Sequence, residues 1–197
     1  MKTRTILLLG LGLPCGLLSA LTTIVPIGDF PGIPLFHHCI GLVLEGRCQG
    51  LAAGLYLGPG LVFGLAYALA LQRGWARASF LVASVLGNTL AVMIAVNTVE
   101  FLDHYLPDAD WLSQVVGGLI AGAVGSGLLA RAAAIRRPGL RWGRLLGIGA
   151  GLGMFLPIAL DDDLGAAGLY IFYALWQGGY GAALAWSTRY FPSSEKP

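Results

Sequence analysis

Side chains of the kinds that bind metal ions gather in one short segment of this chain. His37, His38 and Cys39 are consecutive, and Glu45 and Cys48 follow soon after them. Imidazole, thiolate and carboxylate groups are the ligands that hold zinc, copper or nickel in proteins. The segment is therefore a candidate site for a divalent metal ion, the one cofactor that the sequence suggests.

Two residues farther along the chain, Asp103 and His104, could add a carboxylate and an imidazole to such a site. The spacing of these candidate ligands matches no established metal-binding motif. Acidic residues also gather on a solvated surface without binding a metal ion. We therefore expect a solvated acidic face in preference to a specific metal centre.

Cys39 and Cys48 suggest a second kind of chemistry, because both are expected on the oxidising side of a membrane. They are nine positions apart and could form a disulfide bond. A redox-active pair is less expected, since the chain has no Cys-x-x-Cys sequence. The third cysteine, Cys15, is expected to be a small buried apolar residue.

Two amide side chains interrupt otherwise apolar segments. Asn88 and Gln177 each lie near the middle of a segment that is expected to cross the membrane. An unsatisfied amide is costly in hydrocarbon, so both should face neighbouring helices, where they could bond each other. Alternatively, they form a binding site for a polar solute, with Tyr173, Trp176 and Tyr180 as its aromatic walls.

The composition indicates which elements must position these groups. Of 197 residues, 56% are apolar and only 11% are charged, and the mean hydropathy is +0.75. An average soluble domain has roughly 25% charged residues. These values exclude a disordered chain, and three cysteines are too few for a disulfide scaffold. They predict an all-α, polytopic membrane protein that forms one integral domain over residues 1–197.

Six apolar segments are long enough, or nearly so, to cross about 30 Å of hydrocarbon as helices. None of them contains a charged residue. They are residues 5–25, 51–72, 78–98, 112–130, 145–160 and 166–186. Long continuous apolar runs favour a bundle of three helical hairpins over a β-barrel, which would show short alternating segments.

The charged residues predict the orientation of this bundle. Eleven of the 12 basic residues precede the first segment, follow the last, or lie in the second and fourth connections. Nine of the 10 acidic residues lie in the other three connections. Because basic residues are retained in the cytoplasm, both termini should be cytoplasmic and the acidic loops external. The expected location is the plasma membrane, which would be the inner membrane in a bacterium.

Residues 26–50 form the longest of the expected outer loops. Within it, residues 33–44 are mostly apolar but too short to span, so we expect an interfacial or re-entrant segment. The basic start at Lys2 and Arg4 also allows residues 5–25 to be a cleaved signal peptide, although no small-x-small cleavage site follows. We expect a retained span.

Small residues recur at helical spacing in most of the segments. Gly12 and Gly16 are one example, and Gly118 and Gly122 are another. Helices in a bilayer associate by close packing over such residues. The expected partners are therefore the lipid bilayer and either further copies of the chain or other membrane subunits. Nucleic acid is not expected, because membrane topology already explains the basic loops.

The sequence favours a small transporter or channel for a neutral or small polar solute. Its support is the glycine-rich packing, the central amides and the absence of charge within the segments. The alternative is a non-catalytic subunit or assembly factor of a larger membrane complex. An enzyme or metal-binding protein acting at the outer face is less expected, because no arrangement of a nucleophile and a base is present. We therefore name no catalytic residue.

Overall fold

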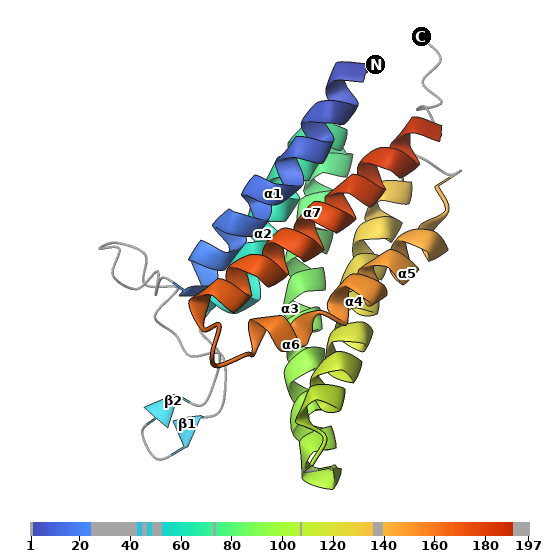
Figure 1. Cartoon of the computed structure of the whole chain (residues 1–197). Coiled ribbons are helices and arrows are strands. Elements are labelled where there is room, and N and C mark those ends of the chain that lie inside the picture. Colours follow the sequence, from blue (N-terminus) through green and yellow to red (C-terminus); the bar gives the residue numbers. More distant parts are fainter. Residues whose placement is uncertain are drawn as a thin grey trace.

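The computed structural model describes residues 2–24, 43–44, 47–48, 53–72, 74–106, 108–135 and 140–190. Seven helices and one pair of short strands make up this described part (Figure 1). In chain order they are α1 (Lys2–Ile24), β1 (Val43–Leu44), β2 (Arg47–Cys48), α2 (Ala53–Leu71), α3 (Trp75–Tyr105), α4 (Asp110–Ala134), α5 (Trp142–Gly153), α6 (Leu156–Ala159) and α7 (Ala166–Tyr190).

The all-α fold is confirmed. The only exception among the described residues is a two-residue antiparallel ladder, in which Val43 pairs with Cys48 and Leu44 with Arg47. This ladder lies within the expected outer loop. Most of the expected interfacial segment, residues 33–42, lies outside the described residues.

The fifth expected segment is not one helix. Helix α5 ends at Gly153, a turn follows at Met154 and Phe155, and the short helix α6 begins at Leu156. Pro157 explains the break, because proline has no N–H to donate and its ring clashes with the carbonyl four residues earlier, here that of Gly153. A 12-residue helix is only about 18 Å long, so α5 alone is shorter than a membrane is thick.

Within the described residues, two helices, α3 and α4, are long and apolar enough to cross a membrane. In α3, the most apolar window has a mean hydropathy of 2.0, yet only 17% of that window is buried. The core helix of a soluble protein would be mostly buried. Large apolar side chains such as Val82, Leu86 and Leu90 instead lie exposed on its outer face. The described parts of α1 and α2 contribute shorter apolar stretches, Gly10–Thr23 and Leu57–Ala70.

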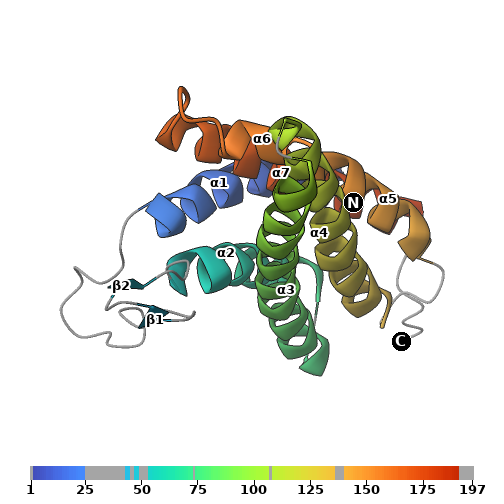
Figure 2. The same ribbon diagram turned by 90° about the horizontal axis from the view of Figure 1, so that it is seen from below.

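The six longer helices form a closed ring. Helix α2 packs on α3, α3 on α4, α4 on α5, α5 on α7, α7 on α1, and α1 on α2. Figure 2 shows the bundle from the end at which α3 and α4 meet, with α6 at its edge beside α7, where α6 also contacts α4. The segments farthest apart in the sequence, α1 and α7, are thus direct neighbours.

Glycines bring the backbones of two neighbouring pairs of helices into contact. A Cβ added to Gly118 would overlap the carbonyl oxygen of Gly153, and one added to Gly122 would overlap that of Gly149. The backbones of α4 and α5 are therefore in direct contact. On the other side of the ring, a Cβ added to Gly16 would meet the backbone of α7. The expected packing over small residues is therefore present at these contacts.

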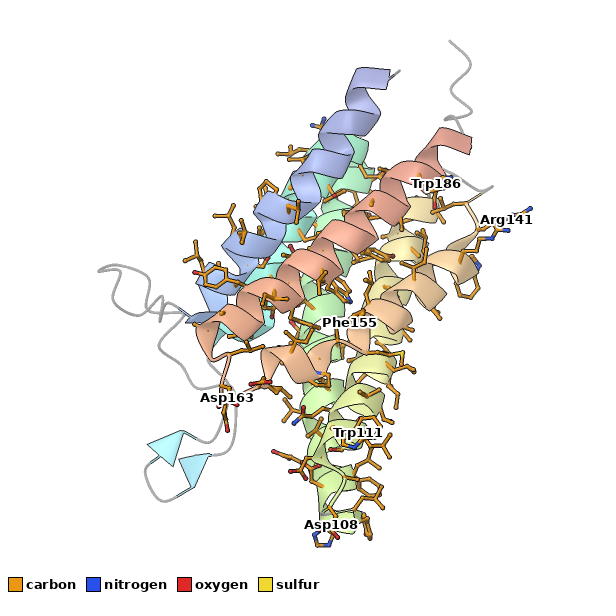
Figure 3. The ribbon with its side chains drawn as sticks, viewed as in Figure 1. Asp108, Trp111, Arg141, Phe155, Asp163 and Trp186 are labelled. Atoms are coloured by element: carbon orange, nitrogen blue, oxygen red, sulfur yellow. The ribbon has the colours of Figure 1, made fainter. Side chains whose placement is uncertain are left out.

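Opposite charges lie at opposite ends of the bundle. Arg141 and Trp186 lie at the end that also carries the N-terminus of α1, whereas Asp108 and Trp111 lie at the far tip of the α3–α4 hairpin (Figure 3). We call these the basic end and the acidic end. The described residues of the basic end include Arg77, Arg131, Arg141 and Arg144, and those of the acidic end include Glu100, Asp103, Asp108, Asp110 and Asp161 to Asp163.

Candidate functional site

A cavity of about 540 Å³ lies inside the ring of helices. Residues from each of the seven helices line it, so it is enclosed by the whole bundle rather than by one pair of helices. Its volume is within the range of roughly 300–1,000 Å³ that is typical of pockets for small molecules. The cavity is therefore the main candidate site in the described part of the chain.

Helix α3 provides one long wall of this cavity. Its lining residues follow the three- and four-residue spacing of a single helix face, and most of them are small. They are Ser84, Gly87, Asn88, Ala91, Val92, Ala95, Val96, Val99 and Glu100. From Ser84 to Glu100 this face is roughly 24 Å long, so the cavity extends from the middle of the bundle toward the acidic end.

Gln177 of α7 lies at the inner end of the cavity and is almost completely buried. Its Oε1 accepts a hydrogen bond from the hydroxyl of Ser19, 3.0 Å away, and its Nε2 donates to the carbonyl oxygen of Pro59 at 3.4 Å. Pro59 has no N–H, but its carbonyl can still accept this bond. The expected functional amide therefore also links α7 to α1 and α2.

Aromatic side chains close the cavity on the side of the basic end. The rings of Trp176 and Tyr180 stack with centroids 5.5 Å apart, and those of Phe63 and Tyr67 stack at 4.3 Å. Phe63 also contacts Trp176 edge to face at 6.3 Å. Beyond these rings, the basic half of the bundle is filled by a buried core that includes Phe80. We call the four stacked rings the aromatic layer.

The structure brings together most of the residues expected to bind solute. Asn88, Tyr173, Trp176 and Gln177 all line the cavity. Tyr180 does not line it but lies directly beneath Trp176, and its hydroxyl donates to the carbonyl oxygen of Ser126 at 2.8 Å. Its position is therefore that of a support for the cavity floor rather than of a wall.

Three further residues of the site were not identified from the sequence. Ser19 bonds Gln177, and Ser84 donates to the carbonyl oxygen of Gly60 at 2.8 Å, which joins α3 to α2. Glu100 lines the acidic end of the cavity. The small or polar residues at 84, 87, 88, 91 and 95 share one helix face, and that spacing could have revealed the α3 wall.

The sequence predicts that Glu100 lies in a loop, because the third apolar segment ends at residue 98. Helix α3 instead continues to Tyr105, so Glu100, Asp103 and His104 are helical. The carboxylate of Asp103 accepts a hydrogen bond from Ser113 of α4, and the ring of His104 packs edge-on against Tyr105. Apolar composition had indicated only the part of the helix that lacks charge.

The expected metal ligands are described only in part. Within the described ranges, no three His, Cys, Asp or Glu side chains come together as a metal site would require. His37, His38, Cys39 and Glu45 lie outside those ranges, as does the side chain of Cys48. The metal site and the Cys39–Cys48 disulfide therefore stay predictions.

Comparison with known proteins gives no family for the chain. No protein-family model matches it, and no curated protein or solved structure is significantly similar to it.

Proposed function

We propose that this chain is an integral membrane protein whose cavity binds a small molecule from the acidic end, and that it works as a small transporter or channel. The observation that supports this most is the cavity itself, which is enclosed by the ring of helices and closed on one side by the aromatic layer. A cavity with one open end and one closed end is what one conformation of an alternating-access carrier requires.

The exposed surface supports the membrane part of the proposal. Leu13, Leu17 and Leu21 of α1 and Leu65 and Leu69 of α2 are all exposed. Together with the outer face of α3, they give the bundle an apolar surface that water would not favour. Each of the six expected spans would then cross the bilayer, with α5, the turn and α6 together forming the fifth.

The broken α5–α6 segment supports a role in transport. A helix interrupted within the membrane is tolerated where its free backbone groups are buried in protein or line a cavity. Gly153, Leu156 and Ala159 line this cavity, and they come from either side of the break. Discontinuous helices of this kind often form the binding site of a transporter.

Cysteine accessibility tests this function. In a background lacking Cys15, Cys39 and Cys48, single cysteines replace Asn88 and Val92, and the purified protein is reconstituted in vesicles. A membrane-impermeant trimethylammonium thiosulfonate is added from the acidic side. We expect rapid modification at both positions, because a thiol ionises and reacts only where water reaches it.

Two positions on the outer face of α3 are the controls. Val82→Cys matches Val92→Cys in residue type, and Leu90→Cys matches it in depth; both native side chains are exposed away from the cavity. Lipid should keep these thiols unreactive. Rapid modification at all four positions would contradict the membrane assignment. If the cysteines at positions 88 and 92 are as unreactive as the two controls, the solute cavity is contradicted and the alternative of a subunit whose groove is filled by a partner is favoured.

A further inference from the structure

The cavity combines a largely apolar wall with a carboxylate at its acidic end. Among the lining residues that the structure describes, Glu100 is the only Asp, Glu, Lys or Arg. None of the described residues forms a hydrogen bond or ion pair with its carboxylate. The Glu100 side chain is exposed, so a cationic group that enters from the acidic end could contact its carboxylate, and opposite charges attract.

The polar groups at the inner end offer little to a polar solute. The oxygen and the nitrogen of the Gln177 amide each already form a hydrogen bond within the protein. The Ser84 hydroxyl likewise donates a hydrogen bond to the carbonyl oxygen of Gly60. A sugar or other highly hydroxylated solute would place many of its groups against alanine, valine and glycine, where they stay unpaired at a cost. The few polar lining side chains, which also include Thr23, Asn88 and Tyr173, suit a solute that is mainly apolar.

The aromatic side chains fit an apolar or aromatic body instead. Trp176, Tyr173 and Phe172 line the cavity from α7, and Phe63 faces them from α2. Rings of this kind bury large apolar areas and attract cations at their faces. The basic residues Arg77, Arg131 and Arg144 belong to the basic end of the bundle, because they lie near the ends of α3, α4 and α5 that meet there. No described arginine lines the cavity to attract an anion.

We infer that the ligand is an amphiphilic organic cation, with its apolar body in the cavity and its charged group at Glu100. This inference rests on the proposed function, because it names the ligand class of the same cavity. It is an alternative to the sequence-based expectation of a neutral or small polar solute. That expectation depended on the absence of charge from the apolar segments, and Glu100 lies just beyond the third of them.

Binding of three probes with similar aryl groups but different charges tests the inference. The full-length protein is placed in phosphatidylcholine nanodiscs, and saturable binding is measured above the background of empty nanodiscs. The probes are tetraphenylphosphonium, neutral triphenylphosphine oxide and the tetraphenylborate anion. We expect tetraphenylphosphonium to bind about tenfold more tightly than the neutral probe, as one partly solvated charge pair would give, and the anion to bind most weakly.

Three variants separate the charge from the cavity. Glu100→Gln should weaken tetraphenylphosphonium binding about tenfold and leave the neutral probe unchanged. Asp108→Asn removes an acidic side chain from the tip of the same hairpin, outside the cavity, and should change binding less than about twofold. Val92→Trp places a large ring inside the cavity and should weaken binding of every probe, whereas Val82→Trp on the outer face of α3 should not. Circular dichroism and the thermal unfolding midpoint confirm that each variant is folded.

The outcomes distinguish the two proposals. If Val92→Trp weakens binding but Glu100→Gln leaves tetraphenylphosphonium binding unchanged, the cavity is the binding site and the cationic ligand class is wrong. If the neutral probe or the anion binds as tightly as the cation, the ligand class is also wrong. Absence of saturable tetraphenylphosphonium binding, in a protein whose cavity cysteines are labelled as expected, would overturn it as well. If Val92→Trp binds every probe as tightly as the unchanged protein does, the cavity is not the site and the proposed function fails with it.

Discussion

The hydroxyl of Ser19 donates a hydrogen bond to the amide oxygen of Gln177, and so connects the first helix of the bundle to the last. Both side chains are almost completely buried. The bond closes the ring of helices at the level of the cavity floor, where Gln177 also contacts Pro59 of α2. A single side chain thus holds three helices around the inner end of the cavity.

Replacing Ser19 by alanine should destabilise the protein, because the Oε1 of Gln177 then loses a buried donor. We expect the free energy of unfolding to fall by about 1 kcal/mol, the size typical of such bonds between membrane helices. Unfolding in mixed detergent micelles, followed by circular dichroism, measures the change. Ser79→Ala is the matched control, since the Ser79 hydroxyl bonds only within its own helix, to Trp75. Equal losses in the two variants would contradict the role assigned to Ser19.

Two glycines of α5, Gly149 and Gly151, should differ sharply in their tolerance of a methyl group. A Cβ on Gly149 would overlap the side chain of Ser126, whereas one on Gly151 would meet nothing within 4 Å. We expect Gly149→Ala to lower the free energy of unfolding by about 1–3 kcal/mol through overpacking. Gly151→Ala should leave it unchanged or raise it by about 0.5–1 kcal/mol, because alanine is the better helix former. The same unfolding assay measures both changes. An equal change in the free energy of unfolding at both positions would argue against the close contact of α4 and α5.

Tyr180→Phe should weaken the support of the cavity floor without removing its stacked ring. The variant loses the hydrogen bond from the Tyr180 hydroxyl to Ser126 but keeps the ring beneath Trp176. We expect a loss of about 1 kcal/mol in the free energy of unfolding. Tyr105→Phe serves as the control, because Tyr105 is exposed and lies at the acidic end. A larger loss in the control than at Tyr180 would contradict the assignment.

Tryptophan fluorescence should locate α3 within the bilayer. Two variants with one tryptophan each are compared. The first keeps only Trp75, at the basic end of α3. The second has Leu90→Trp as its only tryptophan, about 22 Å away along the helix axis. Lipids brominated at mid-chain should quench the tryptophan at position 90 more strongly than Trp75, and lipids brominated near the headgroup should do the reverse. Identical quenching by the two lipids at both positions would contradict a membrane-spanning α3.

The helices could be predicted from the sequence because apolar runs and the placement of charge each depend on local composition. The break at Pro157 was missed for a related reason: the run from 145 to 160 stays apolar across the proline, so hydropathy does not change there. The end of α3 was missed because hydropathy falls at Glu100 whereas the helix continues to Tyr105. Composition shows where a helix is apolar, not where it ends.

The site was predictable only in part for a different physical reason. Asn88 and Gln177 stand out as amides within apolar runs, and both line the cavity. Ser19 and Ser84 do not stand out, because serine is common in such helices and each acquires its role from a partner on another helix. Contacts of this kind depend on the tertiary arrangement, which a single sequence does not reveal.

The aromatic layer also has an electrical consequence. If water fills the cavity from the acidic end down to Trp176, the conducting solution reaches the middle of the bilayer. The transmembrane voltage then falls mainly across the dry half of the bundle, between Trp176 and the basic end. A cation held at Glu100 would experience little of that voltage. One carried past Tyr180 would experience most of it, about 2.3 kcal/mol for each 100 mV. The rate of transport should therefore depend on voltage, whereas the affinity of binding at Glu100 should not.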